Sequence, residues 1–336
     1  MSAGVSEQPR ILVTGGAGYI GSHACKALSA SGYLPVTLDN LSRGHRELVR
    51  FGPFEEGDIR DDARLADVLA RHRPLAIMHF AALSTVSESV HEPWNYYDNN
   101  VHGALTLLES ARRMGIDKFI FSSTCATYGI PERQPIDEDT PQAPINAYGR
   151  SKLAIEFALR DYAAAGSQRS VSLRYFNACG ADPQGDIGEW HDPEPHLIPT
   201  VLMAAAGEID AVEVFGNDYP TPDGTAVRDY IHVSDLADAH LLALKYLLDG
   251  GNTLALNLGT GRGYSVREIV NATGRVTGRT VQTREAPRRS GDAPVLVADA
   301  ARAKSVLGFQ PKWLDIDATI ASAWNWQQRM PGRHRP

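Results

Sequence analysis

Tyr148 and Lys152 have the residue types and the spacing for proton transfer. The two positions, in the segment Tyr-Gly-Arg-Ser-Lys, are one helical turn apart, so both side chains lie on one face of a helix. A phenol loses its proton near pH ~10, but a nearby ammonium group favours the tyrosinate. Tyr148 is therefore a candidate general base for a sugar or alcohol hydroxyl group. Thr124 follows an apolar run and can hydrogen-bond to the same oxygen.

This spacing also occurs in ordinary surface helices, so its meaning depends on the elements around it. The apolar run 11–13 predicts a buried strand, and residues 22–30 predict a helix. Between them, glycines follow a GxxGxxG pattern, which allows a sharp turn, a close approach to a pyrophosphate and packing of the helix on the strand. N–H groups at the helix start would face the phosphates. The candidate phosphate-binding residues are Gly15, Gly18, Tyr19, Ile20 and Gly21.

Asp39 lies at the end of a second apolar strand, residues 34–38. An acidic residue there can hydrogen-bond both ribose hydroxyls of NAD and would repel the extra phosphate of NADP. The strand, glycine turn, helix, strand and acid together predict an NAD site. A bound nicotinamide cation would then also favour the tyrosinate of Tyr148. The alternative is a structural unit with an ordinary glycine turn.

Strands and helices alternate through the first half of the chain. Further strands are expected at 54–59, 75–80, 118–122 and 171–176, and helices at 61–70, 96–114 and 148–164. This alternation predicts an α/β fold, a Rossmann-like doubly wound parallel sheet with helices on both faces. Ligands bind at the carboxyl ends of such strands. We therefore expect residues 1–180 to form an NAD-binding domain that includes Thr124, Tyr148 and Lys152.

From residue 181 the pattern changes, with proline, glycine and acidic residues through 195. Helices are expected at 197–206 and 233–248, and a third helix follows a capping box of Ser265 and Glu268. Short strands are expected near 213–215, 254–258 and 294–297. We expect residues 181–336 to form mainly a smaller mixed C-terminal lobe over the sheet edge. Such a lobe is either a plain cap or one wall of a substrate pocket.

Composition limits the class of protein. The 336 residues are 43% hydrophobic and carry a formal net charge of -7, so nothing favours a nucleic-acid partner. The first residues, MSAGVSEQP, lack a basic start and an apolar run, so we expect no leader peptide, and no apolar run is long enough for a bilayer. The three cysteines are far apart and odd in number. They favour a reducing compartment, and we expect the protein to be cytoplasmic.

One histidine-containing loop is a possible metal site. His191 and His196 lie near Asp192 and Glu194 in a segment interrupted by prolines. A metal ion there is possible, but a solvated polar loop is the interpretation we favour. We therefore expect no metal site.

Motifs along the whole chain then point to one family. Besides the glycine turn they are LDN at 38–40, GDIR at 57–60, HFAA at 79–82, YYDNNVHG at 96–103, STCATYG at 123–129, RYFNACGA at 174–181, FGNDYPTPDGT at 215–225 and VRDYIHVSDLA at 227–237. From Arg10 to near Arg329 the chain resembles the UDP-glucose 4-epimerases, a family of extended short-chain dehydrogenases. The bacterial branch tied to polysaccharide precursor supply is the most similar.

The resemblance implies a role for each matching residue. Tyr148 would be the base, Thr124 its hydroxyl partner, and Lys152 would tune the base and hold the nicotinamide ribose. The adenosine half of NAD would contact Asp39, Asn40, Asp58 and Ile59, and the rest of it Phe80, Ala81, Ala82, Asn99 and, near the nicotinamide, Tyr175. The UDP-sugar would contact Asn177, His196, Leu197, Phe215, Arg228, Arg289 and Asp292. The two arginines would supply local positive charge for the diphosphate, whereas Arg284 and Arg288 are expected to be solvated surface residues.

The resemblance also implies a reaction and an assembly. A UDP-sugar would be oxidised at C4 to a transient keto sugar, turn over in the pocket and be reduced on the other face, with NAD as the enzyme-bound hydride carrier. Leu296 matches the position beside the C2 substituent of the sugar, and Ser84 replaces a lysine of some members. The helices of 100–114 and 148–164 carry apolar residues beyond one face, as in the family's homodimers.

Rival functions differ in the residues they need. A 4,6-dehydratase requires an acid and a base beside the threonine, but Cys125 and Ala126 follow Thr124. A net reductase would more often use NADP, which Asp39 opposes. A binding module that has lost catalysis would not need the intact set of Thr124, Tyr148 and Lys152. The choice among glucose, N-acetylated and pentose UDP-sugars stays open.

Overall fold

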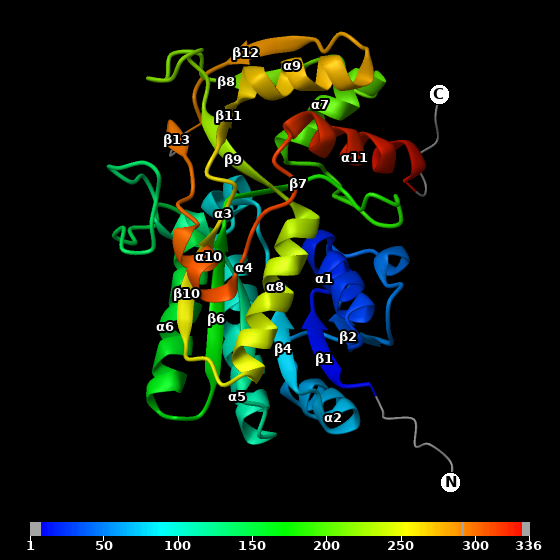
Figure 1. Cartoon of the computed structure of the whole chain (residues 1–336), viewed down its shortest axis with the longest axis vertical. Coiled ribbons are helices and arrows are strands. Elements are labelled where there is room, and N and C mark those ends of the chain that lie inside the picture. Colours follow the sequence, from blue (N-terminus) through cyan, green and yellow to red (C-terminus); the bar gives the residue numbers. More distant parts are fainter. Residues whose placement is uncertain (1–7, 290–291, 331–336) are drawn as a thin grey trace.

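The computed structural model of the chain describes residues 8–289 and 292–330. The segment on which the absence of a leader was judged lies largely outside them, because residues 1–7 are not described. Figure 1 shows a large sheet with helices on both faces in the lower part and a smaller group of strands and helices at the top. No described helix is long and apolar enough to cross a membrane.

A seven-stranded parallel sheet forms the framework of the described chain. Its strands, in spatial order, are β10 (Leu254–Leu258), β6 (Arg169–Tyr175), β5 (Lys118–Thr124), β4 (Ala76–His79), β1 (Arg10–Thr14), β2 (Leu34–Asp39) and β3 (Phe54–Glu56). The order reverses between β1 and β4, which is where doubly wound folds bind ligands. The predicted Rossmann-like class is therefore confirmed.

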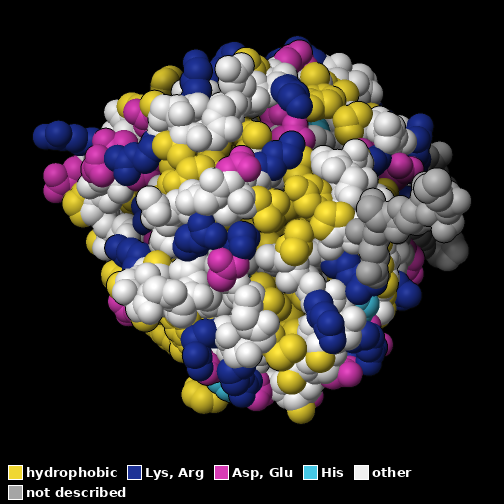
Figure 2. Space-filling model, turned by 60° about the horizontal axis from the view of Figure 1, so that its bottom comes forward, with side chains coloured by type: hydrophobic (Ala, Val, Ile, Leu, Met, Phe, Trp, Pro, Cys, Tyr) yellow, Lys and Arg dark blue, Asp and Glu magenta, His cyan; other side chains and the backbone are white. Residues whose placement is uncertain are grey.

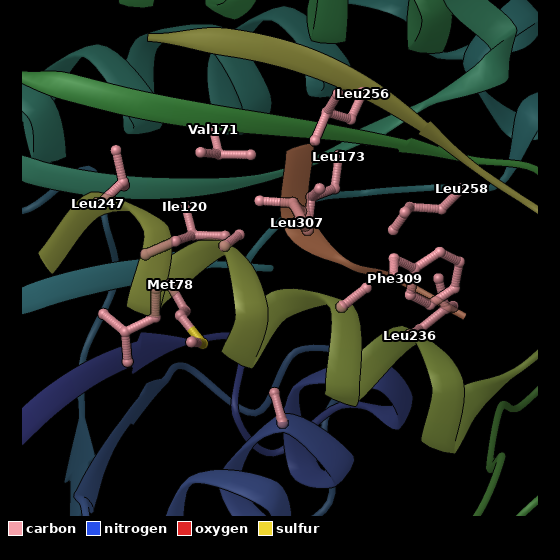
Figure 3. Packing of buried hydrophobic residues seen from close by; sticks show 14 of the residues in the cluster. Met78, Ile120, Val171, Leu173, Leu236, Leu247, Leu256, Leu258, Leu307 and Phe309 are labelled. Carbon is pink, nitrogen blue, oxygen red and sulfur yellow. The ribbon is translucent and has the colours of Figure 1, made fainter. Parts of the chain in front are cut away.

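Both faces of the sheet are covered, which explains why its strands are apolar without alternation. Ile11 and Val13 of β1 point into a core with α1 (Tyr19–Ala30) and α8 (Val233–Leu248). Leu12, between them, points into a second core with α2 (Asp62–His72), α5 (Gly103–Arg113) and α6 (Ala147–Ala164). Figure 3 shows the first core, where Leu247 of α8 lies on the side of Ile120 and Val171 and Leu236 lies on the side of Leu258 and Phe309.

The smaller lobe contains short strands and helices from the second half of the chain. Its four-stranded sheet is mixed, with β7 and β13 parallel and β11 antiparallel to β9, and β8 pairs separately with β12. The strands are β7 (Asn177–Cys179), β8 (Val212–Phe215), β9 (Val227–His232), β11 (Gly263–Ser265), β12 (Thr283–Ala286) and β13 (Val295–Leu296). The helices are α7 (Leu197–Ala206), α9 (Val266–Thr277) and α11 (Ile316–Arg329), whereas α10 (Ala301–Leu307) packs in the core on the large sheet. The predicted capping box of Ser265 and Glu268 begins α9.

The large sheet takes one strand from the second half of the chain. We expected 254–258 in the smaller lobe, but β10 pairs in parallel with β6 at the sheet edge, and α8 covers the sheet beside it. That expectation was wrong because local periodicity identifies a strand but not its neighbour. Strand pairing is decided by contacts with residues far away in the sequence.

The helix expected over 96–114 is interrupted. A π-helical segment, η2 (Tyr97–His102), separates the short helix α4 (Pro93–Tyr96) from α5, and α3 (Val86–His91) precedes them. Two 3-10 turns, η1 (Arg46–Leu48) and η3 (Cys125–Thr127), complete the described elements. On the face in Figure 2, Lys and Arg side chains alternate with Asp and Glu, so that face has no continuous basic surface for a nucleic acid.

Candidate active site

The glycine turn follows β1 and begins α1 without a side-chain cap. Gly15 has a φ of +74°, and a Cβ there would lie 2.5 Å from the backbone nitrogen of Ala81. A Cβ on Gly21 would lie 2.2 Å from the carbonyl oxygen of Gly15, so the helix can approach the strand only through glycine. Gly18 is the N-cap and provides no side-chain hydrogen bond to the helix start. The first N–H groups of α1, including those of Tyr19 and Ile20, are thus suited to bind an anion.

Asp39 ends β2 next to this turn. Its carboxylate accepts hydrogen bonds from the backbone N–H of Ala17 at 3.0 Å and of Leu41 at 2.9 Å. Burial raises the pKa of Asp39, and these two hydrogen bonds act in the opposite direction. The carboxylate is therefore held rigidly beside the helix that begins at the glycine turn. A pair of adjacent ribose hydroxyls is the ligand that such a group would accept.

The next strand end places Asn40 and Asp58 together. Asn40 Nδ2 donates to Asp58 Oδ2 at 2.9 Å, and Arg60 pairs with the same carboxylate at 2.7 Å. The hydrogen bond from Arg60 lowers the pKa of Asp58 below its usual range. Ile59 is buried between these polar residues and the start of α5, because it packs against Gly103. The geometry brings together the residues expected around the adenosine.

The end of β4 lies on the other side of the turn. Phe80, Ala81 and Ala82 are half-buried there, and the N–H of Ala81 donates to Thr14 O at 3.1 Å. Asn99, in the π-helical segment, donates to Asn100 Oδ1 at 3.0 Å. Ser84, in contrast, is exposed.

Asn100 is a residue that the sequence analysis missed. Its side-chain amide accepts from Leu83 N at 2.8 Å and donates to Leu83 O at 2.9 Å, and it also donates to Ser151 at 3.1 Å. Asn100 thereby fixes the loop after β4 to helix α6. The only sequence signal was its place in the YYDNNVHG motif, because a buried asparagine looks like a surface residue in a local pattern.

The three candidate catalytic side chains meet at the end of β5. The N-cap Asn146 accepts from Gly149 N at 2.8 Å and begins α6, which places Tyr148 in its first turn. A Cβ on Gly149 would lie 2.5 Å from Ala126 O, so glycine is needed where the helix meets the turn after Thr124. Tyr148 and Thr124 are hydrogen-bonded. Lys152 Nζ donates to the carbonyl oxygen of Ser122 at 2.8 Å.

Burial dominates the titration of this group. It raises the pKa of Tyr148 far above the ordinary phenol value, an effect increased by Tyr175 and opposed by the Thr124 hydrogen bond. Burial also lowers the pKa of Lys152 to about 7. The expectation that Lys152 lowers the pKa of Tyr148 is therefore not met in the chain alone, because the lysine itself is poorly charged near neutral pH. Positive charge brought by a bound molecule would favour the tyrosinate form of Tyr148.

Tyr175 lies beside this group and adjoins a second missed residue. Its hydroxyl and that of Ser122 are 2.6 Å apart, and burial raises the pKa of Tyr175 to about 12. His240 of α8 lies between two of the predicted cofactor residues, with ring centroids 4.7 Å from Phe80 and 6.4 Å from Tyr175. Its helix was expected in the other lobe, so no local pattern placed His240 here.

A buried ion pair stabilises the chain around Thr124. Glu156, one turn after Lys152 on α6, pairs with Arg174 of β6 at 2.6 Å and accepts from Ser123 Oγ at 2.5 Å. Arg174 also donates to the hydroxyl of Tyr128 at 2.8 Å. These contacts join β5, β6 and α6 immediately behind Thr124. The hydrogen bonds satisfy both charges, as a buried pair requires.

Strands of the smaller lobe bring further predicted residues to the same place. Arg228 of β9 is paired in register with Leu296 of β13, and its guanidinium lies 3.4 Å from Asp292 Oδ1. Leu296 packs on the cluster that contains Cys125 and Phe176, which flank the ends of β5 and β6. Burial raises the pKa of the Cys125 thiol, and the nearby charge of Arg228 acts in the opposite direction. The sheet of the smaller lobe therefore stands over Thr124.

Phe215 and Arg289 form a second pair in this lobe. The Arg289 guanidinium lies 3.8 Å from the centroid of the Phe215 ring. Arg288 instead pairs with Asp218 at 2.6 Å on the surface, and Arg284 is exposed, as expected for both. Of Arg284, Arg288 and Arg289, Arg289 is thus the one whose side chain packs on a predicted UDP-sugar residue, Phe215.

The remaining predicted residues lie where β7 and α7 begin. Asn177 starts β7 and pairs with Tyr230 of β9, and Leu197 begins α7 and packs on the core of the lobe. His196 is the N-cap of α7, and its Nδ1 lies 2.7 Å from Glu189 Oε1 and 3.2 Å from Glu194 Oε1.

The loop before His196 differs from the expected solvated loop. The Glu189 and Glu194 side chains are each only 7% exposed, whereas Asp192 is exposed and takes no part. Burial alone would lower the histidine pKa values, but the two carboxylates raise that of His191 to about 9 and that of His196 to about 10. The loop folds inward because each buried charge has an opposite partner.

The residues present fit an NAD molecule. A glycine cradle that a Cβ would fill, an uncapped helix start and the buried Asp39 carboxylate lie in succession along the carboxyl edge of the sheet.

Cys25, Cys125 and Cys179 are buried and free.

Comparison with known proteins places this site in context. Residues 11–259 match the family model described as "NAD dependent epimerase/dehydratase family". The UDP-glucose 4-epimerase of Rhizobium meliloti is 57% identical over 319 residues, which cover 95% of this chain and 97% of that protein.

Solved structures give the same result. The UDP-glucose 4-epimerase of Brucella ovis in complex with NAD has 54% identity and a TM-score of 0.92, covering 94% of this chain and 98% of that one. The UDP-glucose 4-epimerase of Bifidobacterium longum in complex with NAD+ and UDP has 40% identity and a TM-score of 0.92, covering 96% of this chain and 99% of that one.

Proposed function

This chain belongs to the NAD dependent epimerase/dehydratase family, and we propose that it is a UDP-glucose 4-epimerase. It interconverts UDP-glucose and UDP-galactose through a transient 4-keto sugar and uses enzyme-bound NAD. The observation that carries this proposal is the meeting of Thr124, Tyr148 and Lys152 at the end of β5 beneath Arg228 and Leu296. The relatives that resemble the chain over nearly its whole length are UDP-glucose 4-epimerases.

The cofactor is held by the residues of the sheet edge. The N–H groups of Tyr19, Ile20 and Gly21 bind the pyrophosphate, and Gly15 and Gly18 shape the turn, in which Gly18 N donates to Gly15 O at 3.1 Å. Asp39 binds the adenosine ribose, and its charge favours NAD over NADP. The remaining contacts come from Asn40, Asp58, Ile59, Phe80, Ala81, Ala82, Asn99, Lys152 and Tyr175. When bound, NAD accepts and returns a hydride and adds positive charge to the crevice.

Tyr148 is the group that moves the proton. Its hydroxyl takes the proton of the sugar 4-hydroxyl and later returns it, while Thr124 holds the same oxygen. The high pKa of Tyr148 in the chain alone keeps it protonated until positive charge enters the site. Lys152, whose Nζ donates to Ser122 O at 2.8 Å, stabilises the tyrosinate when it carries its proton, and the tyrosinate in turn favours that proton on the lysine.

The smaller lobe holds the nucleotide of the substrate. Arg228 and Arg289 neutralise the diphosphate, and the Phe215 ring beneath Arg289 fixes that guanidinium. Asn177, His196, Leu197 and Asp292 provide further contacts, and Leu296 lines the sugar pocket. Residues 1–180 thus mainly bind NAD and residues 181–336 mainly bind the substrate, with α8 and β10 returning to the large sheet.

A panel of UDP-sugars tests the proposed reaction. Purified protein is incubated separately with UDP-galactose, UDP-glucose, their N-acetylated counterparts and a pentose analogue, and the product sugars are identified. UDP-galactose and UDP-glucose should each yield a mixture of both. Denaturing the protein should release NAD and no NADP. A product that has lost water, or no turnover with NAD bound, would contradict the proposal.

We further infer a homodimer. Leu105 on α5 and Phe157 on α6 are 38% and 52% exposed, and Trp94 in the adjoining segment is 74% exposed. These apolar side chains lie on neighbouring helices that would pair across a twofold axis in a second copy. The unpaired state of the cysteines supports a reducing compartment, and we propose the cytoplasm.

A further inference from the structure

Four side chains of one short loop converge on a common centre. They are Glu189, His191, Glu194 and His196, and one potential ligand atom from each lies within 4.8 Å of all the others. None of them belongs to the catalytic group at the end of β5, and only His196 is also one of the proposed UDP-sugar contacts. Imidazole nitrogen and carboxylate oxygen are together typical ligands of zinc.

Three of the four histidine–carboxylate distances in this cluster are longer than a charge-assisted hydrogen bond. Nδ1 of His191 lies 3.4 Å from Glu189 and 3.5 Å from Glu194, and Nδ1 of His196 lies 3.2 Å from Glu194 and 2.7 Å from Glu189. Charge-assisted hydrogen bonds are typically about 2.7–2.9 Å long. Ligands at about 2.0–2.2 Å from a tetrahedral zinc ion lie roughly 3.4 Å apart. Of these four distances, the 2.7 Å one between His196 and Glu189 would have to lengthen around such an ion.

His191 gives an independent indication. Its Nδ1 is buried and makes no hydrogen bond, although it points between two carboxylates. A buried polar atom without a partner costs free energy unless something satisfies it. An ion at the centre of the cluster would satisfy it directly.

The charge balance is compatible with a divalent cation. Two nearly buried carboxylates bring two negative charges into one place, and they need either a proton on each imidazole or one divalent ion between neutral imidazoles. The loop is also fixed before any ion binds. Trp326 Nε1 donates to Glu189 O at 2.8 Å, and the Trp190 ring stacks on His45 at a centroid distance of 3.9 Å.

We propose that Glu189, His191, Glu194 and His196 form a structural site for a transition-metal dication, with Zn²⁺ as the preferred ion. Imidazole ligands select against Mg²⁺ and Ca²⁺. With four protein ligands the site has no open position, so it holds structure and does no chemistry. The ion fixes the start of α7, and with it His196 and Leu197, to the loop that follows β7.

Metal analysis of the full chain tests this site. Untagged protein is equilibrated with Zn²⁺, dialysed against metal-free buffer and analysed for zinc per chain. Wild type should retain about one zinc ion per chain. His191→Gln and Glu194→Gln should lose affinity by more than the about 10- to 100-fold that outer-shell changes cost. His102→Gln is the matched control, since His102 also adjoins a carboxylate, Asp98, but is exposed and outside the cluster.

Two further measurements keep the result interpretable if a variant folds poorly. Wild type loaded with Co²⁺ should show the visible absorption of a tetrahedral ion, and a chelator should lower its melting temperature. Circular dichroism and the released NAD report whether each variant is folded. Wild type that retains no zinc, or zinc retained equally by wild type and folded His191→Gln, would overturn the proposal. Binding of Mg²⁺ in preference to Zn²⁺ would also overturn it.

Discussion

At the scale of single residues, burial decides what the predicted groups can do. Tyr148 and Lys152 are both more than nine-tenths buried, and their pKa values move toward the neutral forms. In the proposed mechanism, positive charge that enters with the cofactor would favour the tyrosinate. Leu296, only half-buried, adjoins Cys125 at the same place and touches the proposed sugar pocket.

Tyr148→Phe removes the proposed base and little else. The variant should fold and carry NAD, yet turn over UDP-galactose at least ~10²-fold more slowly, the usual scale for a lost general base. Steady-state rates and the NAD released on denaturation check this. Tyr162→Phe, on the same helix but bonded to Glu109, is the control and should behave like wild type. Near-normal turnover by Tyr148→Phe would refute the assignment.

Leu296→Tyr tests the width of the sugar pocket. Leucine is shorter than tyrosine, so wild type should favour UDP-galactose and UDP-glucose and turn over the N-acetylated pair weakly. Steric rejection by one or two atoms is worth about 1–3 kcal/mol. The tyrosine variant should lose the weak activity and keep the main one, whereas Leu296→Met should change neither. Unchanged selectivity in Leu296→Tyr would mean that the side chain does not line the pocket.

At the scale of elements, helix starts and strand ends position the site. The uncapped start of α1 faces the glycine turn, and the capped start of α6 carries Tyr148. The π-helical segment η2 places Asn100 inward, where its amide holds both backbone groups of Leu83. This side chain therefore supports the loop after β4, together with Tyr96, whose hydroxyl donates to Thr85 O at 2.6 Å.

Asn100→Ala should loosen that loop. Leu83 N and O and the Ser151 hydroxyl would lose a buried partner, which costs about 1–3 kcal/mol for each group left unsatisfied. We expect a lower melting temperature and faster loss of NAD during dialysis. Asn95→Ala, an exposed change in α4, is the control and should alter neither. Equal melting temperatures for the two variants would show that the amide contributes no support.

At the scale of the whole molecule, two features matter: how the two lobes are joined, and which apolar side chains one chain leaves exposed. The large sheet is completed by β10, and the smaller lobe stands over β5 through β9 and β13. The apolar side chains of α5 and α6 remain exposed in one chain.

The homodimer predicts a mass of twice the chain by light scattering at micromolar concentration. Leu105→Arg combined with Phe157→Arg places charges in the middle of the proposed interface and should give monomers. The control is Leu314→Arg, because Leu314 is 58% exposed but lies outside α5 and α6. A monomeric wild type would refute the dimer.

Buried histidines predict a loss of stability in mild acid. Burial lowers the pKa of His23 and His240 to about 4 and that of His79 to about 3. Since an unfolded histidine titrates near pH ~6.5, unfolding takes up protons below that value. The contribution of these histidines to the free energy of unfolding should therefore be constant above pH ~6.5 and fall between there and pH ~4, by about 1.4 kcal/mol per pH unit for each histidine.

Denaturant unfolding from pH 8 to pH 4.5 measures this slope. His240→Gln should flatten it, because the variant has one proton fewer to take up. A slope that is unchanged in this variant would mean that His240 is already charged in the folded chain.

Elements that depend on the geometry of a single helix, strand or turn could be predicted from the sequence alone. One helical turn between Tyr148 and Lys152, three glycines after an apolar strand, and an acid at the end of β2 follow from the geometry of single helices and turns, and each lies where it was predicted. The strands of the large sheet could be recognised for the same reason, since burial on both faces requires continuous apolar runs.

Only the tertiary structure decided which distant residues meet. It placed β10 in the large sheet, brought Leu296 to Cys125, folded Glu189 and His196 together and put Asn100 inside. Local periodicity contains no information about strand partners, and a polar side chain has the same letter whether it is solvated or buried with a partner. Burial and pairing depend on contacts between segments far apart in the chain, and these same contacts set the pKa values of Tyr148, Lys152 and His196.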